Sequence, residues 1–185
     1  MRFCLNGTTP PSHSQVNFDK LLNPHPLADN TTVRLDMDNE PQPDVLLKLE
    51  ERVGGQSRID DDDYVAGAPE LIAEIAASSA VIDLRDKLRV YRRVQEYLVW
   101  QVRDRRLDWF TLTEYVPLQA DAEGVLRSEI FPGLWLAVPA LLEEDFAGVL
   151  AVLQEGLGTS NRGAFVQQLR QVQSDRFSAT TIDSK

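Results

Sequence analysis

The sequence predicts a mixed α/β domain, in which helices flank a central sheet and further helices follow at the C-terminal end. Short apolar segments with alternating polar residues recur along most of the chain, as in strands. The amphipathic segments 81–94 and 146–157 have the period of helices instead. The chain has 185 residues, 43% of them hydrophobic, which is enough for one domain with a real core.

The first part of the chain predicts two strands after an irregular beginning. Residues 1–30 are rich in Asn, Pro, Ser and Thr, so we expect a poorly ordered or altered N-terminal segment. Apolar and polar residues alternate over 32–37, which is typical of a strand. The prolines of the turn at 39–43 restrict the backbone and lead into an apolar strand over 44–49.

A loop and a short buried strand follow. Residues 52–63 contain two consecutive glycines and four consecutive aspartates, which predicts a solvated loop. Calcium binding there is disfavoured, because the glycine and glutamate spacing of an EF-hand is missing. The strand predicted over 71–75 carries Glu74 at a position where a buried strand favours a hydrophobic residue.

The next segment, 81–94, predicts a helix that Ser78 or Ser79 caps. Asp83 and Lys87 lie one turn apart on it, about 6 Å along the axis. A lysine on the core-facing side of a helix is costly without a carboxylate partner, and Glu74 is the natural candidate. The alternative is that Lys87 extends toward solvent and pairs with Asp83 as an ordinary i,i+4 bridge.

The rest of the chain predicts more strands and then helices. A hairpin joins strands over 97–102 and 107–112. Asn161 is the expected cap of the last helix, and the tail after Ser174 is expected to be frayed. We expect a core domain over 31–142 and a C-terminal helical extension with a frayed tail over 143–185. The remaining predicted elements are short strands at 115–118, 125–128 and 134–138, a helical turn at 139–142, and helices at 146–157 and 164–172.

Composition limits the environment and the partners. Cys4 is the single cysteine, which excludes an internal disulfide and fits a cytoplasmic protein. No secretory signal and no apolar run long enough to span a membrane is visible. The net charge of -10 argues against a surface that coats nucleic acid, but residues 81–106 hold eight basic and four acidic residues. This local positive charge either attracts DNA or only solvates an amphipathic helix.

Asp44, Glu74 and Lys87 are the candidate catalytic residues. Two carboxylates and a lysine brought together can hold a divalent metal, activate water and stabilise the transition state of phosphate hydrolysis. This set is typical of a metal-dependent nuclease. Two structural alternatives remain open: Asp44 caps the turn after Pro43, and Glu74 is a strand-end carboxylate that reaches solvent.

With these residues, the chain resembles the Uma-two family of restriction endonucleases, in the PD-(D/E)xK nuclease superfamily. The resemblance covers about residues 33–138. It is carried by Gln42-Pro43-Asp44-Val45, by Gly67-Ala68-Pro69-Glu70-Leu71-Ile72-Ala73-Glu74-Ile75 with Ser78-Ser79, by Asp83, Lys87 and Tyr91, and by Glu96-Tyr97-Leu98-Val99.

The resemblance implies a restriction-endonuclease-like mixed sheet and magnesium-dependent cleavage of DNA. It makes Asp44 and Glu74 metal-binding acids, with the carbonyl of Ile75 as a further ligand. Ala76 stands where the superfamily pattern places lysine, so the resemblance implies that Lys87 has taken that role from the helix.

The sequence thus predicts a hydrolase, an endodeoxyribonuclease that uses Mg²⁺, with Mn²⁺ as the alternative metal. DNA is the expected partner, and a homodimer is an arrangement that the sequence allows. Arg85, Arg89 and Arg92 are candidates to hold the DNA backbone, since phosphate contacts give position without sequence. The alternative is a catalytically degenerate nuclease-like scaffold that acts as a protein-interaction module.

Overall fold

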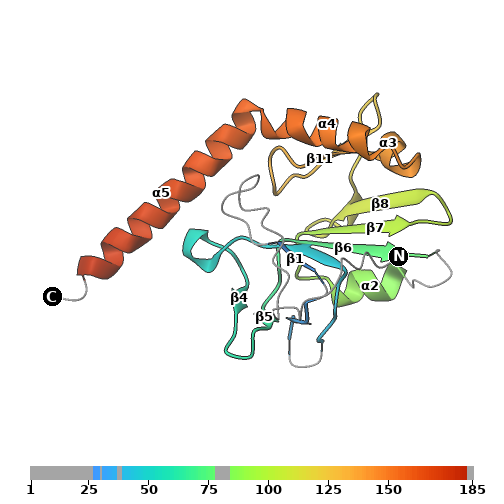
Figure 1. Ribbon diagram of the computed structural model, residues 1–185. Coiled ribbons are helices and arrows are strands. Elements are labelled where there is room, and N and C mark those ends of the chain that lie inside the picture. The colour runs from blue at the N-terminus through green and yellow to red at the C-terminus, as the bar shows by residue number, and fades with distance from the viewer. Residues whose placement is uncertain (1–26, 30, 37–38, 78–83, 183–185) are drawn as a thin grey trace, which may run out of the picture.

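The computed structural model of the protein describes residues 27–29, 31–36, 39–77 and 84–182 (Figure 1). The predicted caps Ser78 and Ser79 and the helix residue Asp83 lie outside the described residues, as do residues 1–26.

A six-stranded mixed sheet forms the centre of the protein. β6 and β7 are parallel neighbours, and the other pairs in this sheet are antiparallel. Parallel neighbours need a crossover connection, and α2 lies in it. The predicted mixed sheet with flanking helices is therefore confirmed. The strand order is β1 (Leu27–Asp29), β3 (Val45–Leu47), β6 (Leu71–Ala76), β7 (Glu96–Gln101), β8 (Arg106–Thr111) and β9 (Val116–Pro117).

Side chains alternate between the two faces of this sheet, and each face has its own core. α2 (Leu84–Val90) lies against one face, below β6 in Figure 1. The core on that face includes Ile72, Tyr91 and Tyr97, all fully buried. On the other face, Leu71 and Trp109 pack with Phe131, near the two-stranded sheet of β10 (Val125–Arg127) and β11 (Trp135–Ala137).

A three-stranded sheet adjoins the α2 side of the core. It has the order β2 (Val33–Arg34), β5 (Val65–Ala66) and β4 (Arg58–Ile59). β2 pairs with β5 in parallel, whereas β4 and β5 form an antiparallel hairpin. Val33 and Val65 are fully buried, so this small sheet contributes to the same core as α2.

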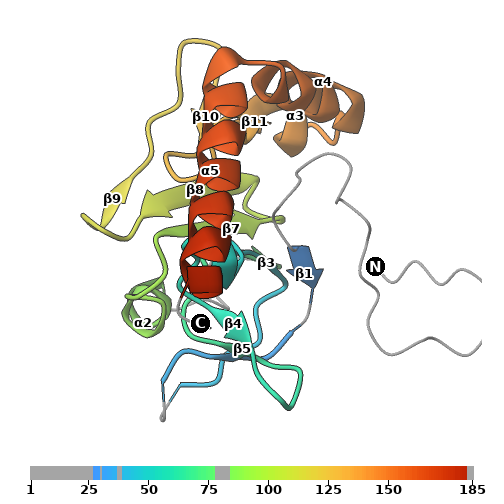
Figure 2. The same ribbon diagram turned by 90° about the vertical axis from the view of Figure 1, so that its left-hand side faces the viewer.

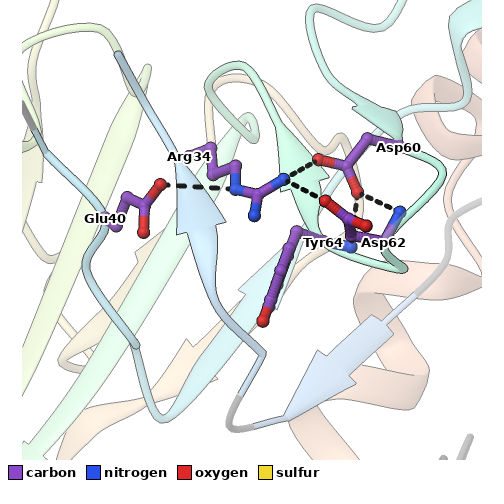
Figure 3. Close-up of polar contacts among 5 residues, drawn as sticks. All are labelled: Arg34, Glu40, Asp60, Asp62 and Tyr64. Carbon is purple, nitrogen blue, oxygen red and sulfur yellow. Dashed lines mark hydrogen bonds and ion pairs between the residues drawn. The ribbon is translucent and has the colours of Figure 1, made fainter. Parts of the chain in front are cut away.

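Arg34 fastens the β4–β5 hairpin to β2 (Figure 3). Its Nη1 donates to Oδ2 of Asp60 at 2.7 Å and to Oδ2 of Asp62 at 3.1 Å. Its Nε lies 3.3 Å from Oε1 of Glu40, and its guanidinium stacks 4.1 Å from the centre of the Tyr64 ring. One arginine thereby pairs with three carboxylates in this acidic region.

The C-terminal part is helical. α3 (Val138–Leu142) leads to α4 (Phe146–Leu157), whose bounds match the prediction, and the side chain of Asp145 caps α4 by accepting from the amide of Gly148. α5 (Ser160–Ile182) then runs at an angle to α4 (Figures 1 and 2). Its far part is tied to η1 (Glu51–Val53), since Arg176 Nη1 donates to the carbonyl of Glu51 at 2.6 Å.

Several local predictions differ from the structure. Leu27–Asp29 forms β1, because it pairs with β3, although we expected residues 1–30 to be poorly ordered or altered. The loop predicted over 52–63 contains part of η1 and β4. α2 ends at Val90 rather than at residue 94, because the amides of Gln95 and Glu96 must reach the carbonyl of Glu70 to start β7.

The last helix also differs from its prediction. Thr159, not Asn161, caps α5, because its Oγ1 accepts from the amide of Arg162 at 3.3 Å. The helix continues to Ile182, past Ser174, where we expected fraying to begin. The bond from Arg176 to η1 fixes the helix beyond that point.

Candidate active site

Asp44 and Glu74 come from neighbouring strands. β3 and β6 are antiparallel, and Val45 pairs with Ala73. Asp44, which directly precedes β3, therefore lies beside Glu74. Oδ2 of Asp44 accepts a 2.7 Å hydrogen bond from the amide of Ile75. Asp44 is exposed, whereas only 10% of the Glu74 side chain is accessible. The Asp44 carboxylate is thus accessible to solvent, whereas the Glu74 carboxylate is largely shielded from it.

Three side chains donate hydrogen bonds to the carboxylate of Glu74. Lys87 Nζ and the Tyr91 hydroxyl each lie 2.7 Å from Oε1, and the Tyr97 hydroxyl lies 3.1 Å from Oε2. Tyr91 follows α2 directly, and its amide donates to the carbonyl of Lys87 one turn earlier. Tyr97 approaches from β7, in the same core as Tyr91. These donors satisfy a charge that would otherwise be too costly to bury.

The two tyrosines remain neutral donors. Burial, together with the hydrogen bond and charge of Glu74, raises the pKa of Tyr91 well above its usual range. Burial and the charge of Glu74 do the same to the pKa of Tyr97. Their rings stack with centres 5.2 Å apart. The two tyrosines therefore restrict the movement of the Glu74 carboxylate.

The structure brings Asp44, Glu74 and Lys87 together on one sheet face, at the end where β6 stops. The pairing of Lys87 with Glu74 is the one that we favoured over a bridge to Asp83. Ile75 contacts Asp44 through its amide, and its side chain is 52% exposed. Its role as a metal ligand through the carbonyl stays a prediction.

The predicted DNA-backbone arginines lie on α2 or, for Arg92, directly after it. Arg89 is two positions from Lys87, which places it about 200° around the helix, away from Glu74. Arg89 and Arg92 are both exposed and line a cleft of about 480 Å³ with Asn39. Arg85 lies in the first turn of α2, and its side chain is outside the described part of the structure.

Two tyrosines and two glutamates were missed as partners. Tyr91 stands four residues after Lys87, so the helical period puts both on one side. Tyr97 lies on a strand, on the sheet face of Glu74. These two periods could have indicated the tyrosines as partners of Glu74. Glu70 and Glu96 are nearly fully buried carboxylates at the opposite end of β6 and β7. Nothing in their sequence context reveals their partners, which are mostly backbone amides distant in the chain, together with Trp109 and Ser128 for Glu96.

The donor chemistry fits a hard divalent cation. Asp44 and Glu74 offer carboxylate oxygens, which Mg²⁺ prefers, and Mg²⁺ usually keeps several waters beside one or two carboxylates. Within the described residues, no group of three or more His, Cys, Asp or Glu side chains is arranged for a metal. A cation here would therefore depend on these two acids, with water and substrate as further ligands.

A mixed sheet that gathers two carboxylates and a lysine at one end defines a restriction-endonuclease-like fold. The family model Uma2, described as "Putative restriction endonuclease", matches residues 9–139. The chain therefore belongs to the Uma2 (Uma-two) family, as the sequence motifs indicated, and this places it among nucleases. The match begins well before residue 33, so it includes part of the segment that we expected to be altered.

One solved structure shows a distant likeness. It is the crystal structure of a putative nuclease belonging to DUF820 from Anabaena variabilis ATCC 29413, with 12% sequence identity and a TM-score of 0.48. The likeness covers 68% of this chain and 74% of that chain. No curated protein matches the sequence. Among the described residues, no helix has the length and apolar character needed to cross a membrane.

Proposed function

We propose that the protein is a metal-dependent endonuclease that hydrolyses phosphodiester bonds of DNA. The observation that carries the proposal is the meeting of Asp44, Glu74 and Lys87 at one end of the sheet, in a member of a nuclease family. Asp44 and Glu74 would hold Mg²⁺ or Mn²⁺. When bound, the cation would polarise the scissile phosphate and lower the pKa of water.

Lys87 has the position that the proposed chemistry needs. Its ammonium group is 2.7 Å from Glu74, and 39% of its side chain is accessible, so it can also reach a substrate. There it orients the attacking water or neutralises the charge that develops on the phosphate. Tyr91 and Tyr97 hold the Glu74 carboxylate in place for this task.

Nicking of supercoiled plasmid tests the proposal. We expect Mg²⁺-dependent cleavage by the wild type and a loss of roughly a hundredfold or more in Lys87→Ala and in Glu74→Gln, as for removal of one electrostatic stabiliser. Arg127→Ala is the matched control, because it breaks an ion pair of similar exposure with Asp121, away from the site. Circular dichroism checks that each variant folds.

Metal binding is a separate readout. Calorimetry with Mg²⁺ should show weak binding by the wild type and weaker binding by Glu74→Gln, because one of two protein ligands is lost. Equal binding by both proteins would remove Glu74 from the metal site. Cleavage retained in Lys87→Ala would refute the role given to the lysine.

A catalytically degenerate scaffold that binds a protein partner is the second candidate. One observation favours it: the Glu74 carboxylate already accepts three hydrogen bonds, which explains its presence without catalysis. A folded wild type that cleaves none of several DNA substrates with Mg²⁺ or Mn²⁺ would support this alternative.

A further inference from the structure

The hairpin between β7 and β8 lies at the same sheet end as Glu74. β7 runs parallel to β6, so both strands finish at this end. The amide of Val102 donates to the carbonyl of Ala76, and the amide of Arg103 donates to that of Ala77, both at 2.9 Å. The hairpin is thereby fastened to the segment that directly follows Glu74.

This hairpin concentrates exposed positive charge. Arg103, Arg105 and Arg106 are exposed, and Asp104 is the one acid among them. Neither Arg103 nor Arg105 makes an ion pair within the described part of the chain, which leaves their charge available to a ligand. In a protein of net charge -10, such a local excess selects where a polyanion can approach.

A buried polar pair holds the third arginine in place. Arg106 bonds Asp108 in bidentate fashion, with Nε 2.7 Å from Oδ2 and Nη2 2.9 Å from Oδ1. Gln101, only 5% exposed, donates from Nε2 to Oδ2 of Asp108 at 3.1 Å. Arg106 is therefore oriented while 62% of its side chain stays accessible. A preoriented guanidinium matches the geometry of phosphate.

The register gives the separation of Asp108, the partner of Arg106, from the candidate active site. Glu74 pairs with Val99, and Val99 pairs with Asp108, so Asp108 lies two strands from Glu74 on the same face. Two strand spacings amount to roughly 10 Å. Charges of one strand of B-form DNA rise about 3.4 Å each along the helix axis, so phosphates within a few nucleotides of one another span this separation. One DNA strand can thus contact both places.

We propose that the β7–β8 hairpin, through Arg103 and Arg105 and the oriented Arg106, binds the phosphodiester backbone of the DNA strand that occupies the site at Glu74. The proposal rests on the proposed function in that DNA is the substrate. It assigns the main phosphate contacts to the hairpin and not to Arg89 and Arg92, which line a separate cleft with Asn39.

Binding of a fluorescein-labelled DNA duplex by the metal-free protein, measured by anisotropy over a series of KCl concentrations, tests this assignment. Three double variants remove the same charge: Arg103→Gln with Arg105→Gln, Arg89→Gln with Arg92→Gln, and Arg58→Gln with Arg170→Gln. The last pair is the control, because both arginines are exposed and lie on β4 and α5.

We expect the hairpin pair alone to weaken binding, by about tenfold at low salt, and to reduce the salt slope by about two, at 0.9 for each lost phosphate contact. An equal loss in all three variants, a larger loss in the α2 pair, or no binding by the wild type would overturn the assignment. Hairpin-dependent binding without cleavage would leave the inference standing while the proposed catalysis fails.

Discussion

The two ends of the β6–β7 pair each hold glutamates in the sheet, but with different kinds of partners. At the amino end, Glu70 and Glu96 accept mainly backbone amides, which fix loops against the sheet. At the carboxyl end, the donors to Glu74 within the described residues are all side chains. Backbone amides cannot leave without unfolding a loop, whereas lysine and tyrosine side chains can exchange partners. The comparison separates a structural carboxylate from one that is available for chemistry.

At the amino end, the carboxylate of Glu96 connects several parts of the structure by hydrogen bonds. Glu96 is fully buried and accepts from the amides of Glu129 and Ile130, from Ser128 Oγ and from Trp109 Nε1. The four donors come from β8 and from the segment after β10. This carboxylate therefore joins the central sheet to the neighbouring two-stranded sheet.

The largest effect is expected for Glu96→Gln. The amide nitrogen of glutamine cannot accept, so it would leave two buried donors unpaired, and we expect a loss of about 3 kcal/mol in the free energy of unfolding. Urea unfolding measures this loss. Glu155→Gln, on the exposed surface of α4, is the control and should change stability little. A comparable small loss in both variants would erase the distinction between the two ends.

A smaller effect, and on activity more than on stability, is expected for Tyr97→Phe. The change removes one donor to Oε2 of Glu74, so the carboxylate is less well oriented, and we expect roughly tenfold slower plasmid nicking with a stability loss near 1 kcal/mol. Tyr64→Phe is the control, because that ring stacks on Arg34 in a different sheet. If Tyr97→Phe lost stability as Glu96→Gln does and nicked DNA normally, Tyr97 would be structural only.

The smallest effect concerns pH. Burial raises the pKa of Glu96 above its ordinary value of 4.5, although its four donors act in the opposite direction. Between the ordinary and the raised pKa, the folded state binds more protons than the unfolded state. The free energy of unfolding contributed by Glu96 therefore falls as pH rises through this window.

The stability difference between wild type and Glu96→Gln should accordingly be larger near pH 4.5 than at neutral pH. Urea unfolding of both proteins over this range checks the sign. Asp60 and Asp121, whose pKa values are lowered, give the opposite slope, but they are common to both proteins and cancel. If the stability difference instead increased with pH, the four hydrogen-bond donors would lower the pKa of Glu96 more than burial raises it.

Sequence reasoning found the parts of the fold that periodicity encodes. β6, β7, β8 and α4 follow from alternation or from the helical period, which the residues carry locally. β1, β4 and β5 have only two or three residues each, and their pairing partners are what make them strands. Such contacts lie outside any local window, so the sequence could not reveal them.

The candidate site shows the same division. Motif spacing put Asp44, Glu74 and Lys87 in one hypothesis, and the structure places them side by side. The helical period already puts Arg89 on the face opposite the apolar residues, but the period alone does not say how far that face lies from the site at Glu74. The hairpin arginines were counted within the basic segment, yet only the register of β6 to β8 shows that the hairpin lies at the same sheet end as Glu74.

The lengths of chain that separate the three candidate site residues also affect the order in which the site assembles. Glu74 and Lys87 are joined by a short connection, whereas Asp44 arrives through β3, a three-residue strand thirty residues earlier. Closing the longer loop costs more chain entropy, and short strands are weakly held. During folding, the lysine–glutamate half can thus form first. Docking of β3, which brings Asp44, would then complete the pair of carboxylates last.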